Sequence, residues 1–220
     1  MSAVKLYDKL IESGIIGASG TTYFELHGIK TLLQDNSVIG NIIQEWLASF
    51  MKLHGITYSV PDNSQEFPDY FLDESNADHG LLEVKCFKKS PNFDVANFMA
   101  YCRSLSEEPR RLDAQYLIFE YAPIKDGIVI KQLWLKKVWE ITAASERSAV
   151  KIQWKQNQAV NIRPATWYSQ RSAYPPFATR KEFVLALKKV LDTSPAGGDW
   201  RKNWIKVVEK KYQEQTGQAL

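Results

Sequence analysis

The two segments FPDYFL (67–72) and LLEVKCF (81–87) decide the fold, because each is a short apolar run interrupted by charge. Both have the composition of buried β-strands, and the polar stretch at 73–80 predicts a turn that brings them together. Side chains alternate along a strand, so we expect Glu83 and Lys85 on one face of the second strand. A buried charge is costly unless it is paired or binds a metal, which indicates a chemical use for these two.

Asp69 on the first strand is expected to join Glu83 and Lys85 at one site. Two carboxylates about 4 Å apart repel by roughly 4 kcal/mol at an effective dielectric of 20, so the pair requires a metal ion or an ammonium group. Mg²⁺ suits the site, because it keeps several of its waters and takes one or two protein carboxylates. The three residues predict metal-assisted hydrolysis of a phosphodiester, with Asp69 and Glu83 as metal ligands and Lys85 beside the scissile phosphate.

Composition sets broad limits on this function. The 220 residues, 45% of them hydrophobic, suffice for one domain with a substantial core. The formal net charge of +3 permits a nucleic-acid partner without requiring one. Cys86 and Cys102 lack metal-ligand spacing, and the histidines match no metal or hydrolase motif. Without a signal-peptide pattern or a long apolar span, the sequence predicts a cytoplasmic protein that is not bound to a membrane.

The whole chain is expected to form an α/β (α+β) fold, a single domain in which helices flank a central mixed β-sheet. Apolar residues at helical spacing predict helices at 3–13, 38–51, 94–105, 136–144, 181–191 and 200–213. Alternating or continuous apolar runs predict further strands at 115–121, 128–135, 149–154 and 158–163. A β-hairpin with its turn at 19–20 is expected in 14–26. Either Asp35 or Asn36 caps the helix at 38–51, and Asp199 caps the last helix.

Pro68-Asp69 followed by Glu83-Val84-Lys85 resembles the PD-(D/E)xK signature of a nuclease superfamily that includes the type II restriction endonucleases. Two other partial matches have the wrong context. The pair at 61–62 precedes a turn signal, and the acidic-x-Lys at 209–211 lies in a helical charge pattern. The order of the glycines and apolar residues at 14–26, the helix at 38–51 and the two strands also resembles EcoRV-like type II restriction endonucleases.

The EcoRV-like resemblance implies a Mg²⁺-dependent endonuclease that cuts a specific, palindromic or nearly palindromic sequence in double-stranded DNA. By residue it assigns Mg²⁺ binding to Asp69 and Glu83, positioning or activation of the attacking water to Lys85, and a supporting role to Glu45. A helix charge that faces water is the alternative for Glu45.

The resemblance also divides the chain. It implies one restriction-endonuclease-like domain at 1–220, with the catalytic core at 38–135, and it assigns the hairpin at 14–28 to subunit contact in a homodimer. An isolated two-stranded hairpin is marginal in water, so its apolar side chains need another surface. Packing within their own domain is the alternative to a dimer contact.

Two segments carry groups suited to DNA. Lys88, Lys89 and Asn92 follow the second motif strand and could track a phosphate backbone, although a solvated loop has the same composition. In a candidate recognition region at 149–180, the run RPATWYSQR (163–171) offers Arg163, Thr166, Tyr168, Ser169, Gln170 and Arg171. Arg pairs with guanine and Gln with adenine in the major groove. A surface loop with packed aromatic rings is the alternative for this run.

Two other functions fit the same residues. One is a nuclease of the same superfamily that acts on DNA structure, in repair or junction resolution. The other is a non-enzymatic DNA-binding protein in which segment 68–85 holds only a buried ion pair. The restriction function further implies a bacterial or archaeal source and a DNA methyltransferase in the same system, which is not expected to be a stable subunit.

Overall fold

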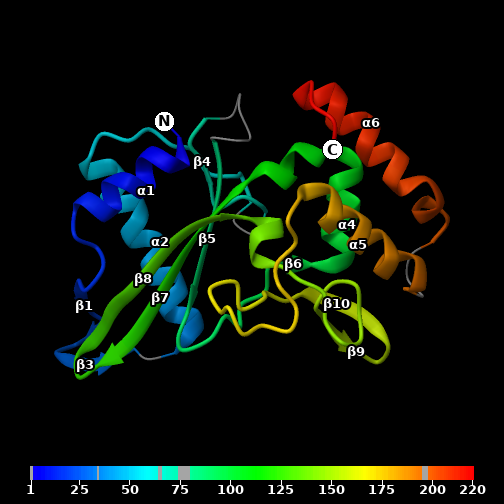
Figure 1. Ribbon diagram of the computed structural model, residues 1–220. Coiled ribbons are helices and arrows are strands. Elements are labelled where there is room, and N and C mark those ends of the chain that lie inside the picture. The colour runs from blue at the N-terminus through cyan, green and yellow to red at the C-terminus, as the bar shows by residue number, and fades with distance from the viewer. Residues whose placement is uncertain (1, 34, 64–65, 74–79, 195–197) are drawn as a thin grey trace. The chain divides into compact units, whose positions relative to one another are not determined.

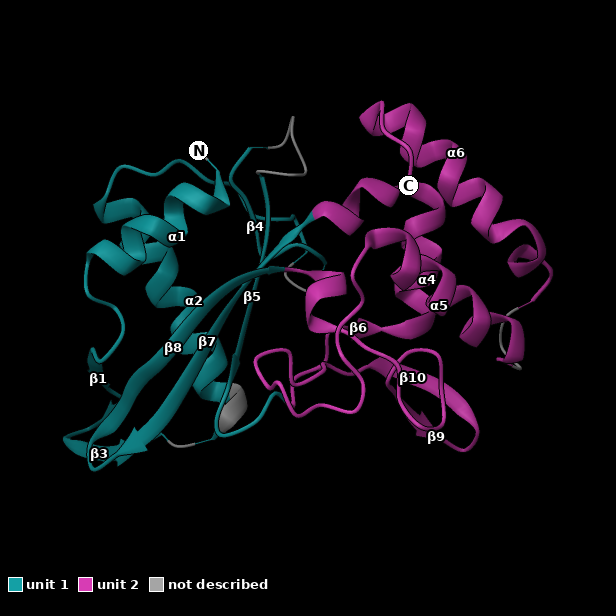
Figure 2. Cartoon of the chain, viewed as in Figure 1, with its two compact units in different colours: residues 1–91, 114–136 teal, residues 92–113, 137–220 magenta. Residues whose placement is uncertain are grey.

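The computed structural model describes residues 2–33, 35–63, 66–73, 80–194 and 198–220 (Figure 1). The chain forms two compact units, residues 1–91 with 114–136 and residues 92–113 with 137–220 (Figure 2). Because the chain passes from one unit to the other and back, each unit is built from segments that are distant in sequence. The assignment of all 220 residues to one domain stays a prediction.

A five-stranded sheet organises the first unit, in the order β1-β8-β7-β5-β4. Its strands are β1 (Ser19–Thr21), β4 (Tyr70–Phe71), β5 (Leu81–Phe87), β7 (Gln115–Ile124) and β8 (Gly127–Lys137). β5 pairs in parallel with β7, whereas β4 pairs with β5 and β1 with β8 in antiparallel fashion. The predicted central mixed sheet and the predicted pairing of the two motif strands are therefore confirmed.

Two helices, α1 (Ala3–Glu12) and α2 (Asn36–Leu53), complete the core of the first unit. The Ser2 hydroxyl caps α1 by accepting the Lys5 N–H at 3.3 Å, and the Asp35 carboxylate accepts the Val38 N–H at 3.3 Å at the start of α2. Each buried Leu or Ile contributes about 1.5–3 kcal/mol through its removal from water. The helices and the sheet share one core, which includes Leu6, Leu10, Ile39, Ile43, Leu47, Met51, Leu82, Leu117 and Phe119.

The N-terminal hairpin differs from the prediction. Residues 19–20, the predicted turn, lie inside β1, where Ser19 is opposite Val129 of β8. The hairpin in the structure joins β2 (Tyr23–Leu26) to β3 (Ile29–Leu32) through His27 at φ 50° and Gly28 at φ 78°. Positive φ at both central residues is what a tight two-residue hairpin loop requires. The predicted hairpin is therefore wrong in its turn and in its pairing.

The second unit combines helices with a three-stranded antiparallel sheet in the order β6-β10-β9. The strands are β6 (Ala96–Asn97), β9 (Ile152–Lys155) and β10 (Gln158–Ile162). The α-helices are α4 (Phe98–Glu107), α5 (Arg180–Thr193) and α6 (Trp204–Thr216). The 3-10 helices η1 (Pro109–Asp113), η2 (Val138–Ile141) and η4 (Asp199–Asn203) also belong to this unit. The Trp204 indole N–H donates to the Cys102 carbonyl at 2.7 Å, so α6 is tied to α4.

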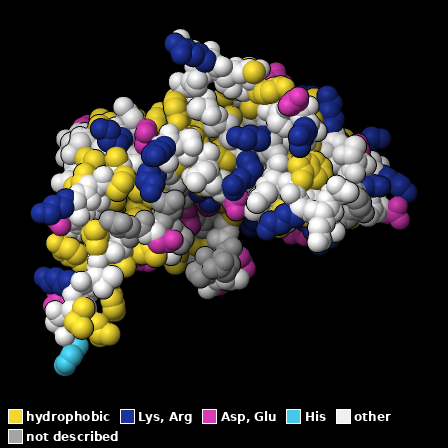
Figure 3. Space-filling model, turned by 90° about the horizontal axis from the view of Figure 1, so that it is seen from below, with side chains coloured by type: hydrophobic (Ala, Val, Ile, Leu, Met, Phe, Trp, Pro, Cys, Tyr) yellow, Lys and Arg dark blue, Asp and Glu magenta, His cyan; other side chains and the backbone are white. Residues whose placement is uncertain are grey.

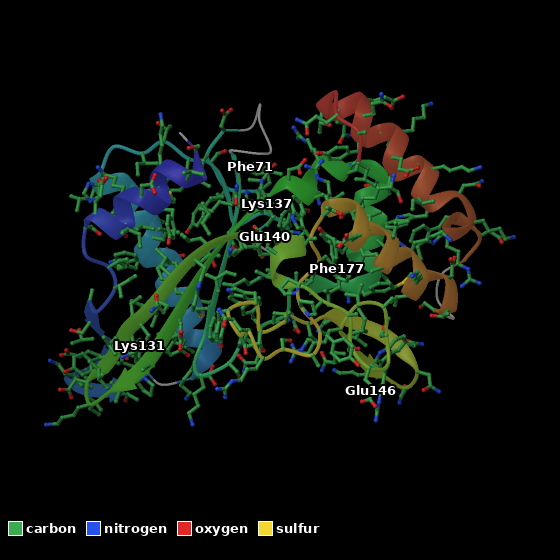
Figure 4. The ribbon with its side chains drawn as sticks, viewed as in Figure 1. Phe71, Lys131, Lys137, Glu140, Glu146 and Phe177 are labelled. Atoms are coloured by element: carbon green, nitrogen blue, oxygen red, sulfur yellow. The ribbon has the colours of Figure 1, made fainter. Side chains whose placement is uncertain are left out.

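Three predicted helices agree with the structure to within two residues at each end, and the other three differ more. α4 begins only at Phe98, because residues 96–97 pair with β10 and the Asn97 side chain caps the helix. The segment 136–144 begins with the last two residues of β8 and continues as the 3-10 helix η2, where the Glu140 carboxylate accepts the Lys137 N–H at 2.7 Å (Figure 4). Residue 199 opens η4 and caps no α-helix, so α6 starts four residues after the predicted helix start at 200.

One buried carboxylate, that of Asp113, is compensated within the second unit. Asp113 is 1% exposed, its Oδ2 accepts the Tyr212 hydroxyl at 2.5 Å, and Arg180 lies 2.8 Å from its Oδ1. Because a buried charge requires such partners, the cluster has a structural explanation. Among the described residues, no helix combines the length and the apolar character needed to cross a membrane.

Candidate active site

The first unit brings together the three residues that the sequence singles out. Asp69 directly precedes β4, whose pairing sets Tyr70 opposite Leu82 of β5. This register places the Asp69 carboxylate at the backbone of the next residues of β5, where its Oδ2 accepts the Val84 N–H at 2.7 Å. On β5, the Lys85 ammonium lies 2.7 Å from Oε1 of Glu83. The prediction that Glu83 and Lys85 share one strand face is confirmed.

Helix α2 holds the other oxygen of the Asp69 carboxylate. The Gln44 amide donates from Nε2 to Oδ1 at 3.0 Å. The Tyr70 hydroxyl, in turn, donates to the Gln44 carbonyl at 2.8 Å. These two bonds connect Gln44 of α2 to the consecutive residues 69 and 70 at the start of β4. The carboxylate is therefore held in one orientation by a side-chain amide and a backbone N–H.

The electrostatic environment of the site disfavours the ionised form of the Asp69 carboxylate. Burial, and then the negative charge of Glu83, raise the pKa of Asp69 from 3.8 to about 6. The Val84 N–H, the Lys85 ammonium and the Gln44 amide act in the other direction, but they do not offset those two effects. The expectation that this carboxylate pair requires a cation is consistent with the raised pKa. A cation bound beside Asp69 would favour its ionised form.

Both cysteine thiols and the Tyr70 hydroxyl stay neutral. Burial raises the pKa of the Cys86 thiol to about 11, despite the Lys85 ammonium beside it, and burial also raises the pKa of Cys102. Neither thiol forms a disulfide. Since the thiolate is the reactive form, both cysteines are inert at neutral pH, as the sequence indicates. Burial, followed by the charges of Asp69 and Glu45, raises the pKa of Tyr70, which keeps this hydroxyl available as a hydrogen-bond donor.

Sequence reasoning selected Glu45 on α2 and missed its neighbour Gln44. Glu45 is exposed, and its influence on the site is electrostatic, on the pKa of Tyr70. Gln44 makes the direct contact with Asp69. A neutral amide gives no charge signal in a sequence, and the rotation of α2 relative to the sheet decides which of the two side chains reaches the site. The supporting role of Glu45 stays a prediction.

The other candidate residues fall into two groups. Lys88 is half-buried and Lys89 is exposed with φ 74°, both in the first unit. The second unit holds the rest, where Asn92, Tyr168, Gln170 and Arg171 are exposed and Arg163, Thr166 and Ser169 are half-buried.

Local contacts fix parts of this second group. Arg163 forms an ion pair with Asp94, the Tyr168 ring lies edge-on to Trp167 at 5.5 Å, and the Ser169 hydroxyl accepts the Arg171 N–H at 3.3 Å. The structure places all these residues on accessible or partly accessible surface, and their contact with DNA stays a prediction.

The donor set fits a hard cation with few protein ligands. In the described parts of the chain, no group of three or more His, Cys, Asp and Glu side chains is arranged to hold a metal. Asp69 and Glu83 offer two carboxylates, the number that Mg²⁺ commonly takes from a protein. A carboxylate has about four acceptor positions on its two oxygens, so the bonds from Gln44 and Val84 leave Asp69 able to bind a cation.

Comparison with protein-family models finds a match over residues 1–220 to the family described as NgoBV restriction endonuclease. Two curated proteins are similar to the chain. The type II restriction enzyme NlaIV of Neisseria lactamica is 35% identical over 225 residues, which span 100% of this chain and 93% of that enzyme. The type II restriction enzyme NgoBV of Neisseria gonorrhoeae is 34% identical over 158 residues, which span 70% of this chain and 90% of that enzyme.

A solved structure, that of the NlaIV restriction endonuclease, is also similar to the chain. It superposes with a TM-score of 0.92 at 35% sequence identity, and the match covers 100% of this chain and 92% of the other. The predicted fold class, a mixed α/β restriction-endonuclease-like fold with a central mixed sheet, is confirmed by this match.

Proposed function

The chain belongs to the NgoBV restriction endonuclease family, and on this premise we propose that Asp69, Glu83 and Lys85 form its catalytic site. It is a type II restriction enzyme, a deoxyribonuclease that cleaves specific DNA. This membership decides against the two alternatives that the sequence left open, a nuclease that acts on DNA structure and a DNA-binding protein without activity.

One observation carries the proposal. Two carboxylates and one ammonium group, all from the paired strands β4 and β5 and the residue before β4, converge in the first unit. Glu83 is 8% exposed, and the pKa of Asp69 is raised by burial and by that neighbour. Buried charges that lower the stability of a fold are typical of a functional site, since selection for stability alone would remove them.

Each residue has a distinct task. Asp69 and Glu83 would be the ligands of the cation, and the Gln44 amide and the Val84 N–H keep the Asp69 carboxylate in place. The Lys85 ammonium, oriented by its 2.7 Å contact with Glu83, positions the attacking water and offsets charge that develops on the phosphate. Protonation of Asp69 removes one ligand, so at subsaturating Mg²⁺ activity is expected to fall as the pH decreases through about 6, and saturating Mg²⁺ should move this fall to lower pH.

Mg²⁺ is the proposed cofactor, as the two-carboxylate donor set and the EcoRV-like resemblance favour it. When bound, Mg²⁺ supplies Lewis-acid stabilisation of the phosphoryl charge and lowers the pKa of the attacking water. Glu45, the exposed α2 residue, is proposed to support the site through its charge. The EcoRV-like branch of the superfamily is proposed on the order of the sequence elements, and a bacterial origin on the sources of the two relatives.

We further propose a two-fold homodimer that cuts a palindromic or nearly palindromic site. Identical catalytic sites related by a two-fold axis can each cut one of two antiparallel strands. One face of the β2–β3 hairpin supports this, because Phe24, Leu26 and Ile29 on it are 54%, 66% and 71% exposed. Figure 3 shows hydrophobic side chains gathered where this hairpin lies. Such a patch on a two-stranded ribbon is typical of an interaction surface.

DNA contacts are proposed at the surface residues identified above. Lys88, Lys89 and Asn92 are proposed to contact the phosphate backbone. Thr166, Tyr168, Ser169, Gln170 and Arg171 are proposed to contact the duplex from the loop after β10. Lys and Arg contacts with phosphate weaken with added salt, which distinguishes them from contacts with base edges.

Digestion of a DNA of known sequence tests the proposed function. With Mg²⁺ present, the purified protein should yield discrete fragments whose mapped ends share one short, symmetric sequence. With the metal removed by a chelator, cutting should stop and should return when Mg²⁺ is added in excess. Cutting that persists in the chelator would contradict the assignment of a metal-dependent site.

A further inference from the structure

The β9–β10 hairpin has two chemically different faces. Residues directly opposite each other in an antiparallel pair share a face. The register sets Gln158 opposite Lys155 and Asn161 opposite Gln153, and the Arg163 N–H continues the ladder by donating to the Lys151 carbonyl at 2.9 Å. The first face therefore carries Lys151, Gln153, Lys155, Gln158, Asn161 and Arg163. The opposite face carries the pairs Ile152–Ile162 and Trp154–Ala159, of which Ile162 and Ala159 are buried.

The composition of this hairpin is unusual for a strand pair. Residues 151–163 contain three Gln, two Asn, two Lys and one Arg, and no Asp or Glu. Asn is depleted in strands, and a surface that serves only solubility normally mixes both signs of charge. Gln156 and Asn157 form the turn with φ 48° and 62°, so two of these five amides stand at the tip. The polar face is therefore built of groups that donate and accept hydrogen bonds, with an excess of positive charge.

One carboxylate from outside the hairpin organises the polar face. The Asn161 amide donates to Asp94 Oδ2 at 2.9 Å and to Gln153 Oε1 at 3.1 Å, and Arg163 pairs with Asp94 Oδ1. Asp94 is exposed and Arg163 and Asn161 are half-buried, so these groups remain within reach of a partner. Side chains held in place by neighbours lose less conformational entropy when they bind. Figure 4 shows the side chains of this region as sticks, near the labelled Glu146 of the preceding turn.

These features fit the edge of a base pair better than a phosphate. The major groove of duplex DNA admits a two-stranded β-ribbon, and each base pair presents there its own pattern of donors and acceptors. Asn and Gln match adenine and Arg matches guanine in this groove. A phosphate requires only donors, and it would not account for the amide pair at 153 and 161.

We propose that the polar face of the β9–β10 hairpin enters the major groove of the substrate and reads base edges, through Gln153, Asn161 and Arg163. Asp94 acts as a positioning residue that orients two of them. The inference uses the proposed function only for the nature of the substrate, duplex DNA. Base reading is thereby assigned to β9 and β10, the strands that precede the run 163–171. Arg163, the first residue of that run, is the last residue on the polar face of the hairpin.

Binding to two duplexes tests this proposal. One duplex carries the site mapped from digestion by the wild-type protein, and the other has the same composition in scrambled order. All proteins carry Asp69→Asn, so that binding is measured without cutting. Asn161→Ala and Gln153→Ala should each lower affinity for the site by about 5-fold to 150-fold, the range for loss of a good base contact. Affinity for the scrambled duplex should change less than about 2-fold.

Two control variants and a folding check complete the experiment. Lys206→Ala, at an exposed position of α6, should leave the ratio of the two affinities unchanged. Gln213→Ala removes an exposed amide from α6, outside every proposed DNA contact, and shows whether any lost amide has the same effect. Thermal melting identifies a variant that fails to fold, and Gln153→Met, which keeps the length of the side chain, then replaces Gln153→Ala.

The outcomes separate the proposals. An unchanged affinity ratio in folded hairpin variants, or an equal loss on both duplexes, would overturn base reading by this face. A wrong catalytic assignment would appear instead as cutting of the site duplex by the Asp69→Asn protein when Mg²⁺ is present, and the affinity ratio is then measured with a chelator in place of Mg²⁺.

Discussion

Replacement of Asp69 by Asn should stabilise the fold at neutral pH while it removes activity. The pKa of Asp69 is about 6 in the folded protein, against an ordinary value of 3.8, so folding favours the protonated carboxyl. The stabilisation from this proton is therefore fully present below about pH 3.8 and is lost as the pH rises through about 6. A shift of about two pKa units corresponds to about 3 kcal/mol. At neutral pH, where the Asp69 carboxylate is ionised, the free energy of unfolding is lower by this amount.

The amide introduced by Asp69→Asn would carry no charge, so the variant would avoid this cost at every pH. The substitution would also change the hydrogen bonds from Gln44 and Val84, at a cost of about 1 kcal/mol that does not depend on pH. A comparison at two pH values cancels that cost. Between pH 5 and pH 7.5, the stability of the variant relative to the wild type should rise by about 1.4 kcal/mol.

Urea denaturation with a chelator present, at both pH values, provides the measurement. All other titrating groups are shared by the two proteins and cancel in the difference. Addition of Mg²⁺ at pH 7.5 should stabilise the wild type and leave the variant unchanged, because the proposed metal site of the folded state requires both carboxylates. A stability difference that is constant with pH, or that favours the wild type more at pH 7.5, would refute the reasoning on Asp69.

Three further predictions concern Lys85, Gln44 and the β2–β3 hairpin. Lys85→Ala should lower the single-turnover cleavage rate by about 100-fold or more, since it removes a charge aimed at the reacting phosphate, whereas Lys89→Ala should change mainly DNA affinity. Gln44→Ala should lower the rate less, by about 10-fold, and raise the Mg²⁺ concentration needed for half-maximal rate, because the carboxylate loses one support. Leu26→Ser with Ile29→Ser should shift the sedimentation of the DNA-free protein from dimer to monomer, and a wild type that is already monomeric at micromolar concentration and cuts both strands without dimerising would contradict the dimer proposal.

The arrangement of the three proposed catalytic residues is predictable because it is local. Asp69 directly precedes β4, whereas Glu83 and Lys85 lie on β5, its partner strand, and the alternation of side chains along β5 determines that these two share a face. The flanking apolar residues also separate the motif from its competitor at 61–62. Site geometry that depends only on neighbouring strands can therefore be predicted from the sequence.

The sequence does not show whether Gln44 or Glu45 contacts Asp69. Adjacent helical residues point about 100° apart, and their approach to Asp69 depends on how α2 packs on the sheet. The sequence favoured the residue with a charge. The contact from Gln44 could be recognised only once the helix was placed.

The prediction of the N-terminal hairpin is wrong for a related reason. Local turn signals at 19–20 favoured a hairpin there, but β1 pairs with β8, which lies far along the chain. A pairing between distant strands leaves no signal in a short window of sequence. Thr22 is buried and lies in the chain between the end of β1 and the start of β2. It therefore separates the edge strand β1 from the β2–β3 hairpin.

Cleavage by the Asp69→Asn protein tests the central claim most directly. Plasmid DNA is incubated with excess Mg²⁺ and with the wild type, the Asp69→Asn variant, or Asp62→Asn, which changes the competing Pro-Asp pair on an exposed segment. Binding to the mapped site is measured in parallel. The account predicts that Asp69→Asn binds DNA but makes no fragments, while Asp62→Asn cuts at the wild-type rate. Discrete fragments from Asp69→Asn at a rate near that of the wild type would contradict it.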